Sequence, residues 1–154
     1  MDLDIPSPPE RAGHMSSPQS AALDRCVGSI HAFNDADWER FFELVGDMVY
    51  VEPPTGRVLQ GDAYREALLA WRRAFSDLTG EITNQAVTAE TAVLEIVWRG
   101  THDGPLAIPG GELPPTGNTA EVHGAIVYRI EGDRPVQGTH YLDLMAVLRA
   151  AGAA

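Results

Sequence analysis

The stretch that decides the fold runs from Thr119 to Asp143 and reads TAEVHGAIVYRIEGDRPVQGTHYLD. Apolar and polar residues alternate on both sides of Gly132-Asp133, a pair of residues typical of a tight hairpin turn. We therefore predict two antiparallel strands, residues 119–130 and residues 136–142, joined at that turn.

Two further strands are predicted upstream, over residues 81–88 and 91–101, with a tight turn between them. Residues 102–118 are rich in proline and glycine and predict a loop. A short closing helix is expected from Leu144 onward. The length fits one domain, which we place at residues 18–152.

Helices are predicted before the strands. Ser17-Pro18 is typical of a helix start, with serine as the N-cap and proline in the first turn. Asp37 is a good N-cap for a second helix, and Gly61-Asp62 opens a third, whose apolar stripe includes Trp71. Helices followed by a meander of antiparallel strands indicate an α+β fold, a curved sheet wrapped on N-terminal helices.

Composition excludes several functions. The chain has 22 acidic and 11 basic residues and a formal net charge of −11, which disfavours binding to nucleic acid and to anionic membrane surfaces. Every basic residue is arginine, so lysine chemistry such as Schiff-base formation is excluded. No apolar run reaches the roughly 20 residues that a membrane helix needs.

Cysteine content and the N-terminal segment bear on location. Cys26 is the single cysteine, so it forms no internal disulfide and builds no thiolate cluster. Residues 1–17 are predicted to be a disordered extension, since most of them are acidic, proline or serine, and they lack the pattern of a signal peptide. We expect a cytoplasmic protein.

A two-residue turn at Gly132-Asp133 would pair Tyr128 with Gln137 and Val122 with Asp143. This pairing places four side chains on one face of the sheet: Tyr128, Thr139, Tyr141 and Asp143. The other face then carries His123 and His140. A single bulge near the turn would reverse part of this assignment.

Asp143 lies where the last strand meets the last helix. A carboxylate at a strand end can project into a cavity walled by the sheet, where desolvation raises its pKa and suits it to proton transfer. The alternative is an N-cap for the helix that starts at Leu144. Tyr141 and Tyr128 are candidate hydroxyl donors to a substrate carbonyl, with plain packing as the alternative.

Other residues are candidates for a binding site. Trp98 and Trp71 can supply flat apolar walls or belong to an ordinary core. Glu52, just before two prolines, can reach a pocket mouth or remain a solvated strand end. His123 and His102 are the candidates to assist an acidic residue.

A metal site is not predicted. His102, His123 and His140 could in principle combine with Asp143, but their spacings match no recognised ligand pattern.

Three segments occur in an order that resembles a known family. They are Gly100-Thr101-His102-Asp103-Gly104 with Pro114-Pro115-Thr116-Gly117, then Ala125 to Ile130 with Gly132-Asp133, and then Thr139-His140-Tyr141-Leu142-Asp143 with Leu148 to Gly152. Together they resemble the SnoaL-like polyketide cyclase family of the NTF2-like, ketosteroid-isomerase-like superfamily. The similarity spans about residues 20 to 152. Asn118 replaces the family's usual lysine, and Thr139 stands where an aromatic residue is usual.

The resemblance implies a cone-shaped α+β barrel with a deep apolar pocket, usually dimeric. Such cyclases close a ring on a polyketide by intramolecular aldol condensation, without a metal or organic cofactor. The aspartate that matches Asp143 serves there as the acid/base. The resemblance therefore implies a small-molecule substrate and a homodimer, and Thr139 implies a wider substrate pocket.

Three alternatives stay open. A pocket of this shape could promote a cycloaddition through conformation alone. Related folds also host isomerases, dehydratases and hydroxylases. A non-catalytic module for ligand binding or dimerisation is the alternative of a different class.

Overall fold

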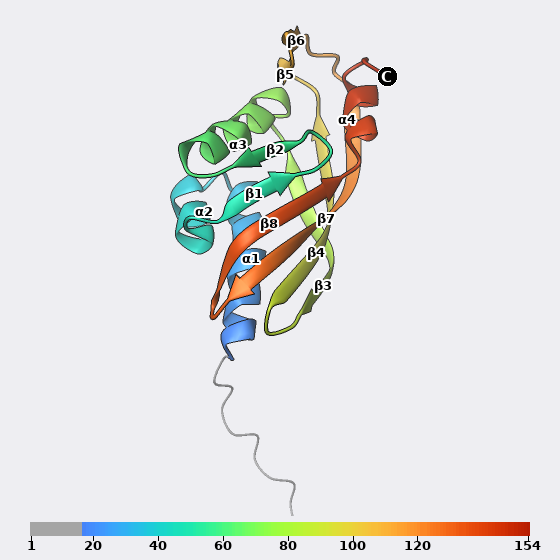
Figure 1. Ribbon diagram of the computed structural model, residues 1–154. Helices are drawn as coiled ribbons and strands as arrows, with labels where there is room; N and C mark the ends of the chain where they lie inside the picture. The colour runs from blue at the N-terminus through green and yellow to red at the C-terminus, as the bar shows by residue number, and fades with distance from the viewer. Residues whose placement is uncertain (1–16) are drawn as a thin grey trace, which may run out of the picture.

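A computed structural model describes residues 17–154 (Figure 1). The predicted disordered extension, residues 1–17, lies outside the described residues except for Ser17. Within the described part, the helices and strands follow one another in the predicted order, and the α+β fold is confirmed.

The helices begin at the predicted caps. The four helices are α1 (Pro18–Asn34), α2 (Trp38–Val45), α3 (Asp62–Ala74) and α4 (Leu144–Ala150). The Ser17 side chain accepts a hydrogen bond from the backbone N–H of Ser20 at 3.2 Å, and Asp37 accepts one from Arg40 at 3.1 Å. Gly61 precedes α3 with a φ of 60°, a conformation that favours glycine.

Six strands form one curved sheet in the order β2-β1-β8-β7-β4-β3. They are β1 (Val49–Glu52), β2 (Arg57–Leu59), β3 (Thr79–Val87), β4 (Thr91–Thr101), β7 (Thr119–Glu131) and β8 (Arg134–Leu142). Neighbouring strands are antiparallel except β1 and β8, which run parallel. The sheet is therefore mixed, whereas the sequence predicted a purely antiparallel one.

The structure contains short strands that were not predicted. The segment 102–118 contains a small separate hairpin of β5 (Leu106–Ile108) and β6 (Gly111–Leu113). The short strand β2 also follows β1 directly. Strands of three residues leave too few positions for an alternating pattern, so periodicity does not reveal them.

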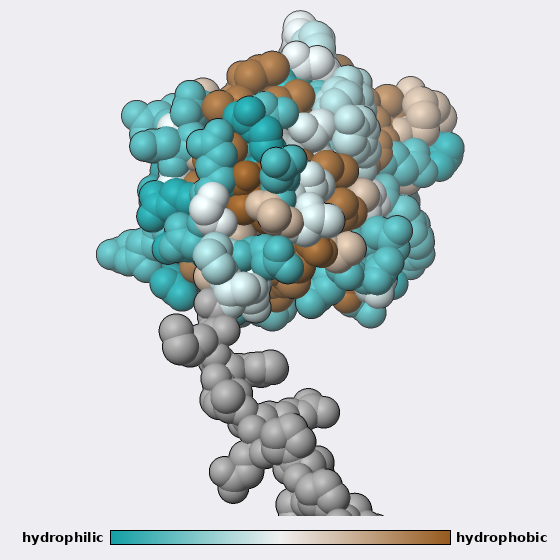
Figure 2. Space-filling view, turned by 60° about the horizontal axis from the view of Figure 1, so that its bottom comes forward, coloured by the Kyte–Doolittle hydropathy of each residue, from teal (hydrophilic) through white to brown (hydrophobic). Residues whose placement is uncertain are grey.

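The helices and the sheet enclose one main core. Helix α1 contacts β3, β4, β7 and β8, and thus lies across one face of the sheet (Figure 1). Its buried residues Ile30 and Phe33 belong to the same core cluster as Leu94 and Ile96 of β4. At the end of the molecule where α1 begins, hydrophilic residues surround small groups of apolar ones (Figure 2). Among residues 17–154, no helix has the length and apolar character required to cross a membrane.

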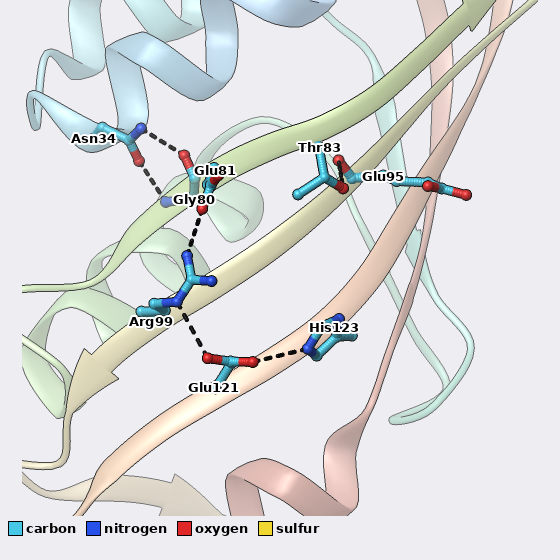
Figure 3. A network of polar contacts seen from close by, with 8 residues as sticks. All are labelled: Asn34, Gly80, Glu81, Thr83, Glu95, Arg99, Glu121 and His123. Carbon is cyan, nitrogen blue, oxygen red and sulfur yellow. Dashed lines mark hydrogen bonds and ion pairs between the residues drawn. The ribbon is translucent and has the colours of Figure 1, made fainter.

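The last residue of α1 binds the edge of the sheet. The Asn34 side chain donates to the carbonyl of Gly80 at 2.8 Å and accepts from its N–H at 2.7 Å (Figure 3). A Cβ at Gly80 would lie 2.7 Å from the ring of Trp98, so glycine leaves room for the indole there. The indole of Trp98 therefore packs against the backbone segment that the Asn34 amide binds.

The loop that follows β4 is attached to the end of α3. The N–H groups of Asp103 and Gly104 both donate to the carbonyl of Ala74 at 3.1 Å. A Cβ at Gly104 would overlap the carbonyl oxygen of Arg73, and backbone atoms cannot swing aside as a side chain can.

Gly104→Ala is therefore expected to lower the free energy of unfolding by about 2 kcal/mol. Urea denaturation monitored by circular dichroism measures this change. The matched control is Gly111→Ala in β6, where an added Cβ has no neighbour within 4 Å. Equal stability of the two variants would contradict the proposed close approach.

Candidate active site

An apolar cavity lies between the helices and the sheet face that they cover. About 780 Å³ of space free of protein atoms lies within the cavity and its open mouth, including solvent at the mouth. Its lining is mostly apolar with a few polar groups, as in pockets that bind small molecules. The lining residues come from all four helices and from four strands: Ser29, Ile30, Phe33, Phe41, Tyr50, Glu52, Tyr64, Leu68, Trp71, Phe75, Leu78, Trp98, Gly100, Ala120, Val122, Ile126, His140, Leu142 and Val147.

A bulge near the turn decides which residues of β8 reach the cavity. Glu131 pairs with Arg134 and Ile130 with Pro135, as a two-residue turn requires. The register then shifts by one residue, so that Ile126 pairs with His140. Beyond this shift, the side chains of β8 lie on the faces opposite to those predicted.

The prediction that Asp143, Tyr141 and Thr139 share the cavity face is therefore wrong. None of the three lines the cavity. The Tyr141 residue is 53% exposed, and the Asp143 side chain is 48% exposed. Asp143 instead caps α4, because its carboxylate accepts the N–H of Ala146 at 3.1 Å.

His123 also lies away from the cavity, with its side chain 69% exposed. Its Nε2 is 3.0 Å from Glu121, which binds Arg99 at 3.3 Å, and Arg99 in turn binds Glu81 at 2.6 Å. Figure 3 shows these side chains in a row across β7, β4 and β3. The row is a surface ion-pair network, and it brings no base to the cavity.

Two other predicted site residues are buried outside the cavity. His102 is fully buried, its ring centroid is 5.3 Å from that of Phe75, and its Nδ1 is 3.1 Å from the hydroxyl of Thr116. Tyr128 belongs to the main core. Neither side chain lines the cavity, so neither contacts a ligand there.

Three predicted binding residues do line the cavity: Trp71, Trp98 and Glu52. Trp98 also packs edge to face on Phe33, with ring centroids 5.2 Å apart. Glu52 is fully buried and so is no solvated strand end.

The polar groups of the cavity form one connected cluster of Glu52, Tyr50, His140 and Trp98, which we call the polar cluster. The Tyr50 hydroxyl is 2.7 Å from Oε2 of Glu52 and 2.8 Å from Nδ1 of His140. The indole N–H of Trp98 donates to Nε2 of His140 at 3.2 Å. These bonds join β1, β8 and β4 through their side chains.

Glu52 carries the charge of the polar cluster. Its Oε1 accepts from Nη2 of Arg57 at 2.8 Å, from Nε of Arg57 at 3.2 Å and from Thr55 at 2.7 Å. Burial alone raises the pKa of this carboxyl, but the hydrogen bonds from Tyr50, Thr55 and Arg57, with the charge of Arg57, bring it below its ordinary value. Glu52 is thus ionised at neutral pH, and both of its oxygens are occupied.

The partners of His140 define its neutral tautomer. An indole N–H only donates, so Nε2 of His140 is the acceptor of the Trp98 bond. An ionised carboxylate only accepts, so the Tyr50 hydroxyl donates to Glu52 and its oxygen accepts the N–H at Nδ1. Burial lowers the pKa of His140 to about 4, although the charge of Glu52 acts in the opposite direction. The imidazole is therefore neutral at pH 7, with its lone pair at Nε2.

Sequence reasoning missed His140 and Tyr50 as site residues. Tyr50 and Glu52 are two residues apart in β1 and hence share a face, and this spacing was a usable signal. For His140 the usable signal was Pro135, because proline within a sheet is found at bulges and strand starts. A bulge there places the His140 side chain on the face opposite to the one predicted. Among residues 17–154, no three His, Cys, Asp or Glu side chains gather as metal ligands would.

Comparison with known proteins defines the class. The family model for the SnoaL-like polyketide cyclases matches residues 25–151, and the chain belongs to this family. No curated protein sequence matches the chain.

Solved structures with the same fold include three bacterial proteins. IdmH of Streptomyces antibioticus, a proposed polyketide cyclase, is 25% identical with a TM-score of 0.70, over 84% of this chain and 97% of that one. AclR of Streptomyces galilaeus, a proposed hydroxylase, is 19% identical with a TM-score of 0.72, over 86% and 85%. A Catenulispora acidiphila protein with a ketosteroid isomerase-like fold is 18% identical with a TM-score of 0.69, over 86% and 95%.

The pKa of His140 predicts how stability depends on pH. The unfolded imidazole binds its proton near pH 6.5 and the folded one only near pH 4, so stability falls as pH decreases through this window, by roughly 3 kcal/mol in total. The lowered pKa of Glu52 also makes stability fall as pH decreases, but in a separate window below pH 4.5. His140→Asn should flatten the decline between pH 6.5 and 4.5, as measured by urea denaturation.

The matched control is His123→Asn, which removes an exposed imidazole from the outer face of the sheet. It should keep the wild-type slope. An unchanged slope in His140→Asn would show that the buried imidazole is not the group that titrates.

Proposed function

We propose that this protein is a cofactor-independent cyclase that closes a ring on a polyketide intermediate by intramolecular aldol-type condensation. The observation that carries the proposal is the position of His140, which lines an aromatic-walled cavity and accepts the indole N–H of Trp98 at Nε2. Membership of the SnoaL-like family supports the substrate class. Homodimer formation and a cytoplasmic location stay predictions from the sequence.

His140 serves as the acid/base in this proposal, in place of Asp143. Nε2 takes a proton from the carbon beside a substrate carbonyl, and the electron pair of the broken C–H bond passes into an enolate. The Trp98 N–H, released from Nε2, then donates to the enolate oxygen. The enolate carbon forms the new bond to a second carbonyl carbon, and the resulting alkoxide takes the proton back from the imidazolium. The step balances without an oxidant, a reductant or a metal.

The apolar wall of the cavity contributes the rest of the rate acceleration. Aromatic side chains such as Phe33, Trp71 and Phe75 surround the space beside the polar cluster. They can hold a flexible chain with its two reacting carbons in contact, and the effective molarity of such an arrangement is large. Exclusion of water also prevents a competing proton transfer to solvent.

Proton transfer is tested with ketones that the cavity binds. A panel of bicyclic and tricyclic ketones, beginning with 2-tetralone, is first screened for a rise in melting temperature. Deuterium exchange of the acidic C–H of a bound ketone is then followed by NMR in D₂O. His140→Asn should slow the catalysed exchange by about 100-fold, since general-base catalysis is worth that much.

Asp143→Asn is the matched control, because asparagine caps a helix as well as aspartate does. It should retain the wild-type exchange rate. Wild-type exchange in His140→Asn would overturn the assignment, and loss of exchange in Asp143→Asn would return the acid/base role to Asp143.

A cycloaddition is the second candidate, and the largely apolar lining of the cavity favours it. Conformation alone would then supply the rate. Replacement of His140 would have little effect on ring formation in that case, while Trp71→Ala would abolish most of it.

A further inference from the structure

We propose that Glu52 and Tyr50 are positioning residues that act through His140, and that Glu52–Tyr50–His140 works as a relay that fixes the imidazole tautomer and stabilises the imidazolium. This inference rests on the proposed function, since it assigns a role to residues beside the proposed base. It adds two side chains that touch the base rather than the reacting carbon.

The relay has a defined direction. Each hydrogen bond runs toward the carboxylate: Trp98 to His140 at 3.2 Å, His140 to Tyr50 at 2.8 Å and Tyr50 to Glu52 at 2.7 Å. The tyrosine hydroxyl donates its hydrogen to the carboxylate, so its oxygen is left to accept the N–H at Nδ1 of the imidazole. The alternative tautomer would place an N–H at Nε2 against the indole N–H of Trp98, where neither has an acceptor.

The charge at the end of the relay is fixed by residues outside the cavity. Arg57 binds Oε1 of Glu52 through two nitrogens, and Thr55 binds the same oxygen. Arg57 is 38% exposed, whereas Glu52 is fully buried. The hairpin from Thr55 to Arg57 therefore keeps the carboxylate ionised without placing a positive charge in the cavity.

The ionised Glu52 compensates for the burial of the base. An imidazolium formed in an apolar cavity is unfavourable, and the negative charge two hydrogen bonds away reduces that cost. When Nε2 has taken a proton, both ring nitrogens are donors, and the Nδ1–H remains bonded to Tyr50. The relay thus serves the ring before and after proton transfer, a role that an orienting carboxylate plays for a catalytic histidine.

The test uses ¹⁵N NMR of the His140 side chain in the full-length protein. The wild type should show a protonated Nδ1 and an unprotonated Nε2 at pH 7. Tyr50→Phe keeps the ring that stacks on Tyr64 with centroids 4.7 Å apart but removes the hydroxyl. In Tyr50→Phe and in Glu52→Gln we expect a mixture of tautomers, a lower titration midpoint for His140 and a kcat for ketone exchange reduced about tenfold. KM should change less than kcat.

Tyr64→Phe is the matched control for the NMR readout, because it removes a hydroxyl from the other ring of the same stacked pair. The His140 tautomer should stay as in the wild type. If Glu52→Gln does not fold, Tyr50→Phe alone tests the relay, since this variant leaves the Glu52–Arg57 pair intact.

The outcomes separate the two proposals. Wild-type tautomer and titration in Tyr50→Phe overturn the relay, whatever the activity of His140→Asn. Wild-type exchange in His140→Asn overturns the proposed function, and the tautomer measurement then still decides whether the relay exists. A shifted tautomer and a reduced exchange rate in Tyr50→Phe, with the wild-type tautomer in Tyr64→Phe, support the relay.

Discussion

A carboxylate without exposed surface needs partners, and this requirement organises one end of the cavity. Glu52 is fully buried at the end of β1 and is neutralised by Arg57, five residues later in the same hairpin. An unpaired buried charge costs several kcal/mol, so the turn that returns Arg57 is needed for stability as well as for the site. Because β1 lies parallel to β8, with Val51 opposite Thr139, the Tyr50 hydroxyl that binds the carboxylate also reaches His140 on β8.

The helices and the long strands were predictable because their signals are local. Ser17 and Asp37 cap the helices that they were predicted to cap, and the strand predicted at residues 91–101 is β4. Trp71, Trp98 and Glu52 were candidates for a binding site, and all three line the cavity. Trp71 belongs to the apolar stripe of α3, so its face follows from its own neighbours.

The rest of the site depends on long-range pairing that no local pattern contains. One unpaired residue at the bulge in β8 turns His140 toward the helices and Asp143 away from them. The parallel pairing of Tyr50 with Gly138 joins segments from opposite ends of the chain. A match to a family motif did not correct for the bulge, because a motif gives the order of residues and not the face on which each one lies.

Stability and the proposed chemistry make opposite demands on His140. Burial keeps the imidazole neutral and its pKa near 4, so Nε2 carries no proton at neutral pH, but the same burial makes the protonated intermediate costly. Water in the cavity would relieve that cost and would also compete for the proton. A fixed negative charge behind the ring relieves it without water, and Glu52 is placed to do so through Tyr50. Since aromatic walls elsewhere carry no such charge, a substrate gains most by turning its reacting carbonyl toward the polar cluster and its rings toward Trp71 and Phe75.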